Sequence, residues 1–155
     1  MESPLMSQSI LCVCLGNICR SPSAQGALER ALPGAVVDSA GTSDWHNGDA
    51  PYGPMQLAAR AQGLDLGGQR ARQVGPDDFT RFDLILAMDA QNLEDLRAMQ
   101  PANSTARLAL YLDALQDGPR DVPDPYYTRD FDGVLALIDR AARAWALRLD
   151  WAQGP

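Results

Sequence analysis

Short runs of apolar residues alternate along the chain with longer segments in which apolar residues recur at helical spacing. The sharpest run is SILCVC at residues 9–14, and FDLILAM at residues 82–88 has the same unbroken character. Unbroken apolar runs of this length are typical of strands that are buried on both faces of a sheet. A weaker run at residues 35–40 and a short one at residues 107–112 give two further candidate strands.

The segments between these runs predict helices. Residues 23–32 place alanine and leucine at helical spacing behind Ser21-Pro22, and Pro33-Gly34 ends the pattern. Further helices are expected at residues 51–62, 91–99 and 130–151, and the last has a core stripe of Val134, Leu137, Ile138, Ala141, Trp145 and Leu149. Residues 41–49 and the Pro- and Asp-rich residues 117–127 are expected to be loops.

The alternation of strands and helices predicts an α/β fold with a parallel sheet covered by helices on both faces. A chain of 155 residues is most simply one domain, here residues 1–155, with about residues 1–8 as a loose N-terminal tail. Ligands of such folds bind at the carboxyl ends of the strands, near a switch in strand order. Cys14 stands at the carboxyl end of the first predicted strand, which is where chemistry is expected.

Composition and charge exclude several classes of protein. The formal net charge is −7 and no long basic run is present, which disfavours nucleic acid or a membrane surface as a partner. No apolar run approaches the ~18 residues that span a membrane. The first residues lack the basic start and apolar stretch of a signal peptide. We therefore expect a cytoplasmic protein.

The cysteines form one crowded group. Cys12, Cys14 and Cys19 lie within eight residues, and His46 is the only histidine. An odd, clustered set argues against a disulfide framework. A zinc site would need about four suitable ligands, so no metal is expected.

The segment CLGNICRS at residues 14–21 brings a thiol, a guanidinium and a hydroxyl together between a strand and a helix. The backbone N–H groups of such a loop can converge on one anion, and Gly16 and Asn17 tolerate unusual backbone angles. Arg20 offers a planar fork to two oxyanion oxygens. Beside this cation and a helix N-terminus, a Cys14 thiolate is stabilised and nucleophilic, so attack on phosphorus is the natural reaction. The alternative is a structural cysteine in a strand–helix turn.

A general acid for such a reaction is offered by VPDPYY at residues 122–127. Asp124 lies between two prolines, which stiffen the backbone on both sides and can hold one carboxyl group over a site. Tyr126 and Tyr127 add aromatic walls for an aryl leaving group. The alternative is a turn in which Asp124 only caps backbone groups and the tyrosines belong to the core.

Together, VCLGNICRSP and DPYY closely resemble the low-molecular-weight protein tyrosine phosphatase family. The resemblance extends over essentially the whole chain and includes DSAGTSDWHNG at residues 38–48, ARQV at residues 71–74 and ILAMDAQNLEDL at residues 85–96. It implies a single-domain, flavodoxin-like fold with a four-stranded parallel sheet. It also implies hydrolysis of phosphotyrosine in proteins, and of small aryl phosphates, through a phosphocysteine, with no metal or organic cofactor.

The resemblance also assigns roles to individual residues. Cys14 matches the nucleophile, Arg20 the phosphate-binding arginine and Asp124 the general acid, which then acts as base on water. Ser21 matches the hydroxyl that steadies the thiolate, Asn17 the asparagine that braces the loop, and Ser39 a serine bonded to that asparagine. The remaining loop residues would bind phosphate through their backbone, and aromatic residues would line the cleft: Leu15, Gly16, Ile18 and Cys19 for the loop, and Trp45, Tyr126 and Tyr127 for the cleft.

Some positions depart from the family pattern or have other interpretations. Gln69 stands where the family often has a histidine, so the hydrogen bonds behind the loop are expected to differ. Cys19 matches a cysteine that can form a reversible disulfide with the nucleophile, which would protect the thiolate. We interpret Cys12 as a core residue, His46 as a solvated loop histidine, and Asp89 chiefly as a helix cap. Rival functions are thiol-based arsenate reduction, for which no downstream cysteine is present, and non-catalytic binding of a phospho-ligand.

Overall fold

The strand β1 (Ser9–Cys14) lies at the centre of a four-stranded parallel sheet. In the computed structural model, which describes residues 8–153, β1 pairs with β2 (Val36–Gly41) on one side and with β3 (Leu84–Ala87) on the other. The strand β4 (Arg107–Leu110) extends the sheet beyond β3, giving the order β2-β1-β3-β4. The predicted α/β fold with a parallel sheet is therefore confirmed. The expected loose tail falls almost wholly on residues 1–7, which lie outside the described residues.

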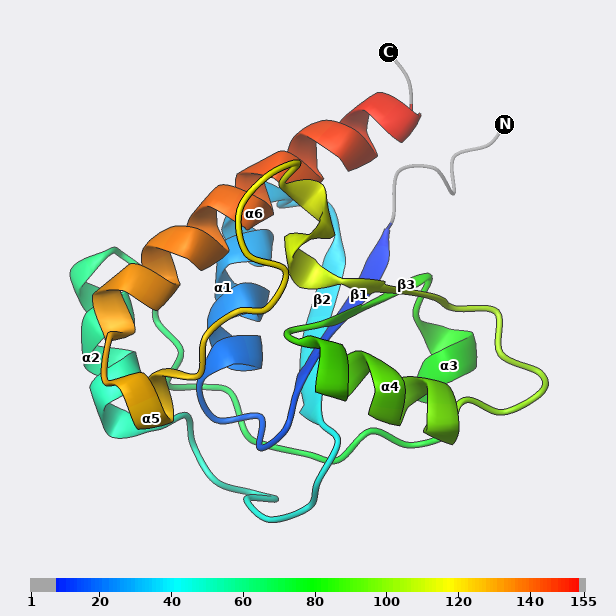
Figure 1. Ribbon diagram of the computed structural model, residues 1–155, viewed down its shortest axis with the longest axis horizontal. Helices are drawn as coiled ribbons and strands as arrows, with labels where there is room; N and C mark the ends of the chain where they lie inside the picture. Colours follow the sequence, from blue (N-terminus) through cyan, green and yellow to red (C-terminus); the bar gives the residue numbers. More distant parts are fainter. Residues whose placement is uncertain (1–7, 154–155) are drawn as a thin grey trace.

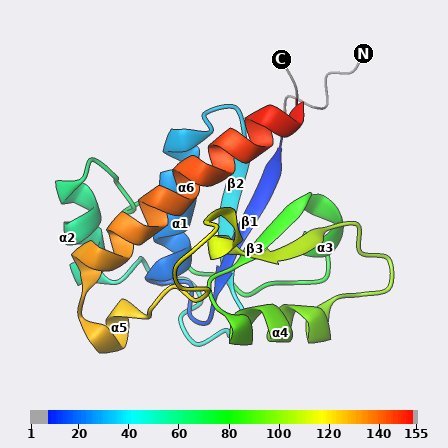
Figure 2. The ribbon, with the colours of Figure 1, turned by 45° about the horizontal axis from the view of Figure 1, so that its top comes forward.

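Helices cover both faces of the sheet (Figures 1 and 2). On one face, Ile10, Cys12 and Cys14 of β1 pack with α1 (Arg20–Ala31) and the long α6 (Phe131–Gln153). On the other face, Leu11 and Val13 pack with α3 (Asp78–Arg81) and α4 (Ala90–Met99). Both faces of β1 are thus buried, which explains its unbroken apolar run. Cys12 and Trp145 are core residues, as predicted.

A third apolar cluster supports the segment that follows Cys14. Met55 and Ala59 of α2 (Gly53–Ala61) form this cluster with Leu64, Leu66, Cys19 and Leu135 of α6. The first turn of α1 is therefore enclosed by α2 and α6. None of the helices described here is both long and apolar enough to cross a lipid bilayer.

Three local predictions were wrong or incomplete. The run at residues 82–88 forms a strand only at β3, because the preceding residues form the unpredicted one-turn helix α3, which buries Phe79. The fourth strand ends at Leu110, and the chain continues as a 3-10 helix, η2 (Tyr111–Ala114). The expected loop at residues 117–127 contains the start of a one-turn helix, α5 (Pro125–Thr128), because Asp124 caps it and proline suits the first helical position.

The strand order determines where a ligand site can form. From β1, the chain moves to β2 on one side of the sheet and then crosses to β3 on the other, so the loops after β1 and β3 diverge. A crevice at the carboxyl ends of the strands opens at such a switch point. Cys14 is the last residue of β1 and Asp89 comes just after β3, so both lie at this edge.

Candidate active site

The loop that joins β1 to α1 has the form of an anion-binding turn. Its backbone passes through Asn17 in the left-handed region, with φ 57°, which asparagine tolerates better than most residues. Within residues 8–153, no acceptor pairs with the backbone N–H groups of Leu15, Gly16, Ile18 or Cys19. These donors and the N-terminus of α1 supply what a bound oxyanion requires.

The Cys14 sulfur lies beneath this turn and is almost completely buried, with 3% of the residue exposed. It accepts a hydrogen bond from the backbone N–H of Asn17 at 3.2 Å. The Ser21 hydroxyl lies 3.0 Å from the sulfur. Both neighbours can therefore donate a hydrogen bond to the sulfur.

The side chain of Asn17 ties the loop to its surroundings. Its Nδ2 donates to the hydroxyl oxygens of Ser21 at 2.9 Å and Ser39 at 3.0 Å. Ser39 donates in turn to Gln25 Oε1 at 2.7 Å and, at the longer distance of 3.4 Å, to Gln69 Oε1. Gln69 therefore remains in contact with this network although it is not a histidine, and its Nε2 donates to the carbonyl of Pro22 at 3.0 Å.

Arg20 is held in place by groups on two other segments. Its Nη1 donates to Asp89 Oδ2 at 2.7 Å and to the carbonyl of Val122 at 3.0 Å. Burial alone would lower the pKa of Arg20, but the charges of Cys14, Asp89 and Asp124 outweigh it and raise the pKa. The guanidinium is therefore firmly cationic. Asp89 does cap α4, as predicted, because its Oδ1 accepts from Asn92 N–H at 2.8 Å, but it also orients Arg20.

The other two cysteines have raised pKa values. Burial, then the charges of Cys14 and Asp124, raises the pKa of Cys19 to about 12, even though Arg20 opposes this shift. Burial also raises the pKa of Cys12 above its usual value. All three cysteines are free thiols in this structure. The reversible disulfide with Cys14 that the resemblance implies for Cys19 is open in this structure.

The segment with Asp124 faces the loop from the opposite side. Asp124 Oδ1 accepts from Tyr126 N–H at 3.0 Å and so caps α5, while Oδ2 lies 3.8 Å from Arg20 Nη2. Asp124 therefore both caps α5 and faces Arg20. Tyr126 and Tyr127 are 46% and 78% exposed, so the alternative that they belong to the core is wrong.

A cavity of about 230 Å³ joins these two segments. Trp45, 72% exposed, and His46 complete its rim from the loop after β2. The cavity is lined by Cys14, Leu15, Gly16, Ile18, Cys19, Arg20, Trp45, His46, Asp124, Tyr126 and Tyr127. Of the residues that the sequence predicts for the site, three lie behind the loop rather than in the cavity: Asn17, Ser21 and Ser39.

Sequence reasoning underestimated two residues of this site. His46 is not merely solvated: its ring lies over Gly16, and its Nδ1 is 3.1 Å from Asp49 Oδ2. The prediction that Asp89 is chiefly a helix cap is incomplete, and its place at the carboxyl end of β3 is the signal for contact with the neighbouring loop. No group of three or more His, Cys, Asp or Glu side chains in the described chain is arranged to hold a metal ion.

Known proteins resemble this chain along almost its full length. The model of the family described as low molecular weight phosphotyrosine protein phosphatase matches residues 9–153. The Bacillus subtilis low molecular weight protein-tyrosine-phosphatase YfkJ is 44% identical over 137 residues, covering 84% of this chain and 88% of its own. An Entamoeba histolytica protein tyrosine phosphatase with Hepes in its active site superposes with a TM-score of 0.87 at 29% identity, covering 94% and 98% of the two chains. Vibrio vulnificus Wzb in complex with benzylphosphonate gives a TM-score of 0.82 at 31% identity, covering 91% and 98%.

Proposed function

The chain belongs to the low molecular weight phosphotyrosine protein phosphatase family, whose members are cysteine-based hydrolases, and we propose that it hydrolyses phosphotyrosine in proteins, and small aryl phosphates, through a phosphocysteine. The observation that carries this proposal is that Cys14, Arg20 and Asp124 line one cavity. A nucleophile, an oxyanion-binding cation and an acid therefore face the same small volume.

In the first proposed step, the Cys14 thiolate attacks phosphorus, so that an S–P bond forms while the bond to the tyrosine oxygen breaks. The loop N–H groups and the Arg20 fork hold the other phosphate oxygens, whose charge they stabilise in the transition state. Asp124, in its protonated form, gives its proton to the leaving oxygen. Its distance of 3.8 Å from Arg20 supports this role, because a phosphate on Arg20 would lie beside it.

In the second proposed step, water attacks the phosphocysteine. The Asp124 carboxylate takes a proton from this water, the S–P bond breaks, and inorganic phosphate leaves as the thiolate is regenerated. The protons balance over the cycle because Asp124 first gives a proton and then recovers one. Neither step uses a metal or an organic cofactor.

The substrate preference follows from the rim of the cavity. Trp45, Tyr126 and Tyr127 are exposed aromatic residues beside the loop that joins β1 to α1. Their rings suit the aryl group of phosphotyrosine, which has to reach past them to bring its phosphorus to Cys14. Benzylphosphonate, which is bound to a relative, likewise joins a phosphorus oxyanion to an aromatic ring.

Hydrolysis of p-nitrophenyl phosphate at mildly acid pH tests the proposal. Cys14→Ser should abolish turnover because the serine hydroxyl is a poor nucleophile at this pH. Asp124→Ala should slow phenyl phosphate far more than p-nitrophenyl phosphate, since only the less acidic phenol needs a proton to leave. Asp117→Ala, an exposed aspartate of the same segment, serves as the matched control and should match the wild type.

Two outcomes would contradict this mechanism. Substantial turnover by Cys14→Ser would exclude the phosphocysteine. Equal losses on both substrates in Asp124→Ala would exclude Asp124 as the acid. Phosphate binding by the wild-type protein without any turnover would instead favour the non-catalytic binding module.

A further inference from the structure

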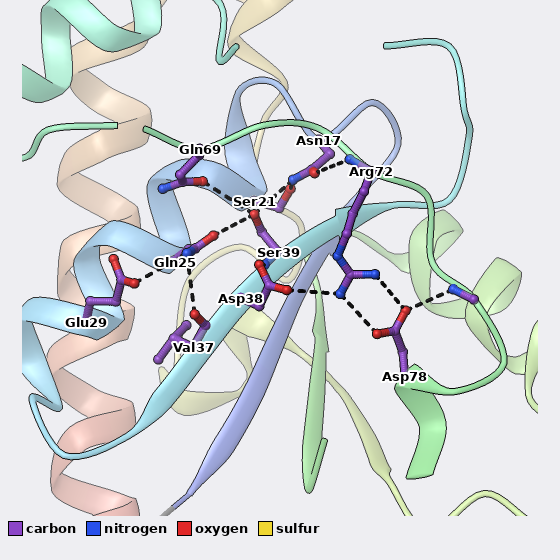
Figure 3. Close-up of polar contacts among 11 residues, drawn as sticks. Asn17, Ser21, Gln25, Glu29, Val37, Asp38, Ser39, Gln69, Arg72 and Asp78 are labelled. Atoms are coloured by element: carbon purple, nitrogen blue, oxygen red, sulfur yellow. Dashed lines mark hydrogen bonds and ion pairs between the residues drawn. The ribbon is translucent and has the colours of Figure 1, made fainter. Parts of the chain in front are cut away.

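We propose that Arg72 is a positioning residue for the nucleophile: its ion pairs hold the backbone N–H that orients Asn17, and Asn17 directs the Ser21 hydroxyl at Cys14. Figure 3 shows the contacts of Arg72 with Asp38, Asp78 and Asn17. The inference rests on the proposed role of Cys14 as nucleophile. Arg72 itself does not line the cavity of the candidate active site. Its effect on the reaction would be transmitted entirely through Asn17.

The Arg72 guanidinium joins two aspartates from different elements. Its Nη1 and Nη2 each lie 3.0 Å from one oxygen of Asp78, in α3, and Nη2 lies 3.1 Å from Asp38 Oδ2, in β2. Asp78 is 4% exposed and also accepts from Gly75 N–H at 2.9 Å. Burial acts to lower the pKa of Arg72, but hydrogen bonds and charge from Asp78 and Asp38 outweigh it and raise the pKa. A two-pronged contact of this kind restricts both the position and the orientation of the side chain.

The backbone of Arg72 is anchored at the same time. Its carbonyl accepts from Gly41 N–H at 2.8 Å, at the end of β2, and Val74 N–H returns to the carbonyl of Gly41 at 2.8 Å. Its own N–H is thereby aimed at Asn17 Oδ1, 3.0 Å away. An N–H group can only donate, so the atom of the Asn17 amide that faces it has to be the oxygen.

This fixes the direction of the remaining hydrogen bonds. With Oδ1 occupied, Asn17 Nδ2 faces the hydroxyl oxygens of Ser21 and Ser39 and donates to both. The Ser39 hydroxyl proton goes to Gln25 Oε1. The Ser21 oxygen already accepts from Asn17, so its proton is free to point at the Cys14 sulfur, 3.0 Å away. If the amide turned over, Ser21 would donate to Asn17 Oδ1 instead, and the thiolate would lose a donor.

The test compares Arg72→Met with Asp78→Asn in the full-length protein. Two quantities are measured: the pH profile of Cys14 alkylation by iodoacetamide, and kcat and KM with p-nitrophenyl phosphate. Losing one donor to a charged group corresponds to a loss of about tenfold or more, so kcat should fall by at least about tenfold and the alkylation profile should move up by about one pH unit or more. We expect KM to change less than kcat, because the loss falls on the nucleophile.

The two substitutions separate positioning from a simple change of charge. Arg72→Met removes a positive charge and Asp78→Asn a negative one, so long-range electrostatics would move the two alkylation profiles in opposite directions. Positioning through Asn17 moves both alkylation profiles to higher pH. The shift is smaller for Asp78→Asn because Asp38 still holds Arg72. The ionisable groups around the thiol stay the same in all variants: Cys12, Cys19, Arg20, His46, Asp89 and Asp124.

Arg30→Met is the matched control. It removes an ion pair with Asp139 at 3.2 Å and a hydrogen bond to the carbonyl of Gln62, both remote from Asn17. Its kcat and alkylation profile should equal those of the wild type. If Arg72→Met fails to fold because Asp78 is left buried and unpaired, Arg72→Met/Asp78→Asn removes that charge and should still show the upward shift.

Two results would overturn the proposal. One is a lower thermal stability of Arg72→Met with wild-type kcat and alkylation profile, which would make Arg72 purely structural. The other is a shift of the Asp78→Asn profile to lower pH. The alkylation profile needs no turnover, so it tests this proposal separately from the proposed function, which fails if Cys14→Ser retains turnover.

Discussion

Asp89→Asn tests how far the orientation of Arg20 controls catalysis. Asp89 has two separable roles, since Oδ2 accepts from Arg20 at 2.7 Å while Oδ1 accepts from Asn92 N–H at 2.8 Å. Asparagine caps a helix about as well as aspartate and retains an oxygen for Asn92. Its Nδ2, however, would face the guanidinium as a second donor. The substitution therefore removes the contact with Arg20 and keeps the cap.

The expected magnitude follows from the burial of this contact. Arg20 is 6% exposed at its side chain and Asp89 22%, so solvent screens the pair only partly. A hydrogen bond to a charged group contributes about 1.5–3 kcal/mol, which corresponds to a loss of about 10- to 150-fold in kcat/KM if the whole contact serves the transition state. The remaining bond from Arg20 to the carbonyl of Val122 at 3.0 Å favours the lower end of that range.

The assay compares two variants by p-nitrophenyl phosphate kinetics and urea unfolding. Asp89→Ala loses both the contact with Arg20 and the cap, so its kcat/KM should match that of Asp89→Asn. The free energy of unfolding of Asp89→Ala should be about 1 kcal/mol lower than that of Asp89→Asn, which is the usual contribution of a helix cap. A wild-type kcat/KM in Asp89→Asn would refute the reasoning, because it would mean that Arg20 finds its working position without this carboxylate.

Two further predictions concern the stability of the fold around the site. A Cβ at Gly41 would lie 2.7 Å from the carbonyl oxygen of Leu15, which belongs to the backbone and cannot turn away. Gly41→Ala should therefore lower the free energy of unfolding in urea by about 1–3 kcal/mol, and it should also lower kcat. Full activity of this variant would contradict the prediction. Burial raises the pKa of Cys12 above its ordinary 9.0, so above that pH only the unfolded chain releases this proton. As the pH rises further, the free energy of unfolding should fall by about 1.4 kcal/mol per pH unit for each such thiol. If Cys12→Ala shows the same slope of free energy against pH as the wild type, this prediction is refuted.

The two central strands, β1 and β3, could be predicted because each is a continuous apolar run, whereas β2 contains Asp38 and Ser39 and gave a weaker signal. Residues 9–14 form β1 with the predicted bounds, and Ile10 to Cys14 each pack against a covered face of the sheet. The one-turn helices were harder to predict from the sequence. Four residues give too little periodicity to identify α3, whereas α5 carried a readable signal in Asp124 followed by Pro125, an N-cap before a proline.

In the candidate site, the residues of one continuous segment could be predicted from the sequence, but the contacts that depend on strand order could not. The segment from Cys14 to Ser21 contains its nucleophile, cation and hydroxyl within one loop, and residue types alone suggested their chemistry. The contact between Arg20 and Asp89 exists because β1 and β3 are neighbours in the sheet. The contact between Arg72 and Asn17 likewise requires residues 71–74 to lie against the end of β2. No local pattern encodes either one.

The candidate site is supported by two hydrogen-bond networks that share the loop backbone but no side chain. One runs from Asp89 to Arg20 and orients the cation that would hold phosphate. The other runs from Arg72 through the side chains of Asn17 and Ser21 to the Cys14 sulfur. Perturbations without shared partners usually add in free energy, so the fold losses in kcat/KM of Asp89→Asn and Arg72→Met should multiply in the double variant. A double variant no worse than the more severe single one would show instead that Arg20 and Cys14 are positioned by a single cooperative unit, in which the loop either has its working shape or loses it altogether.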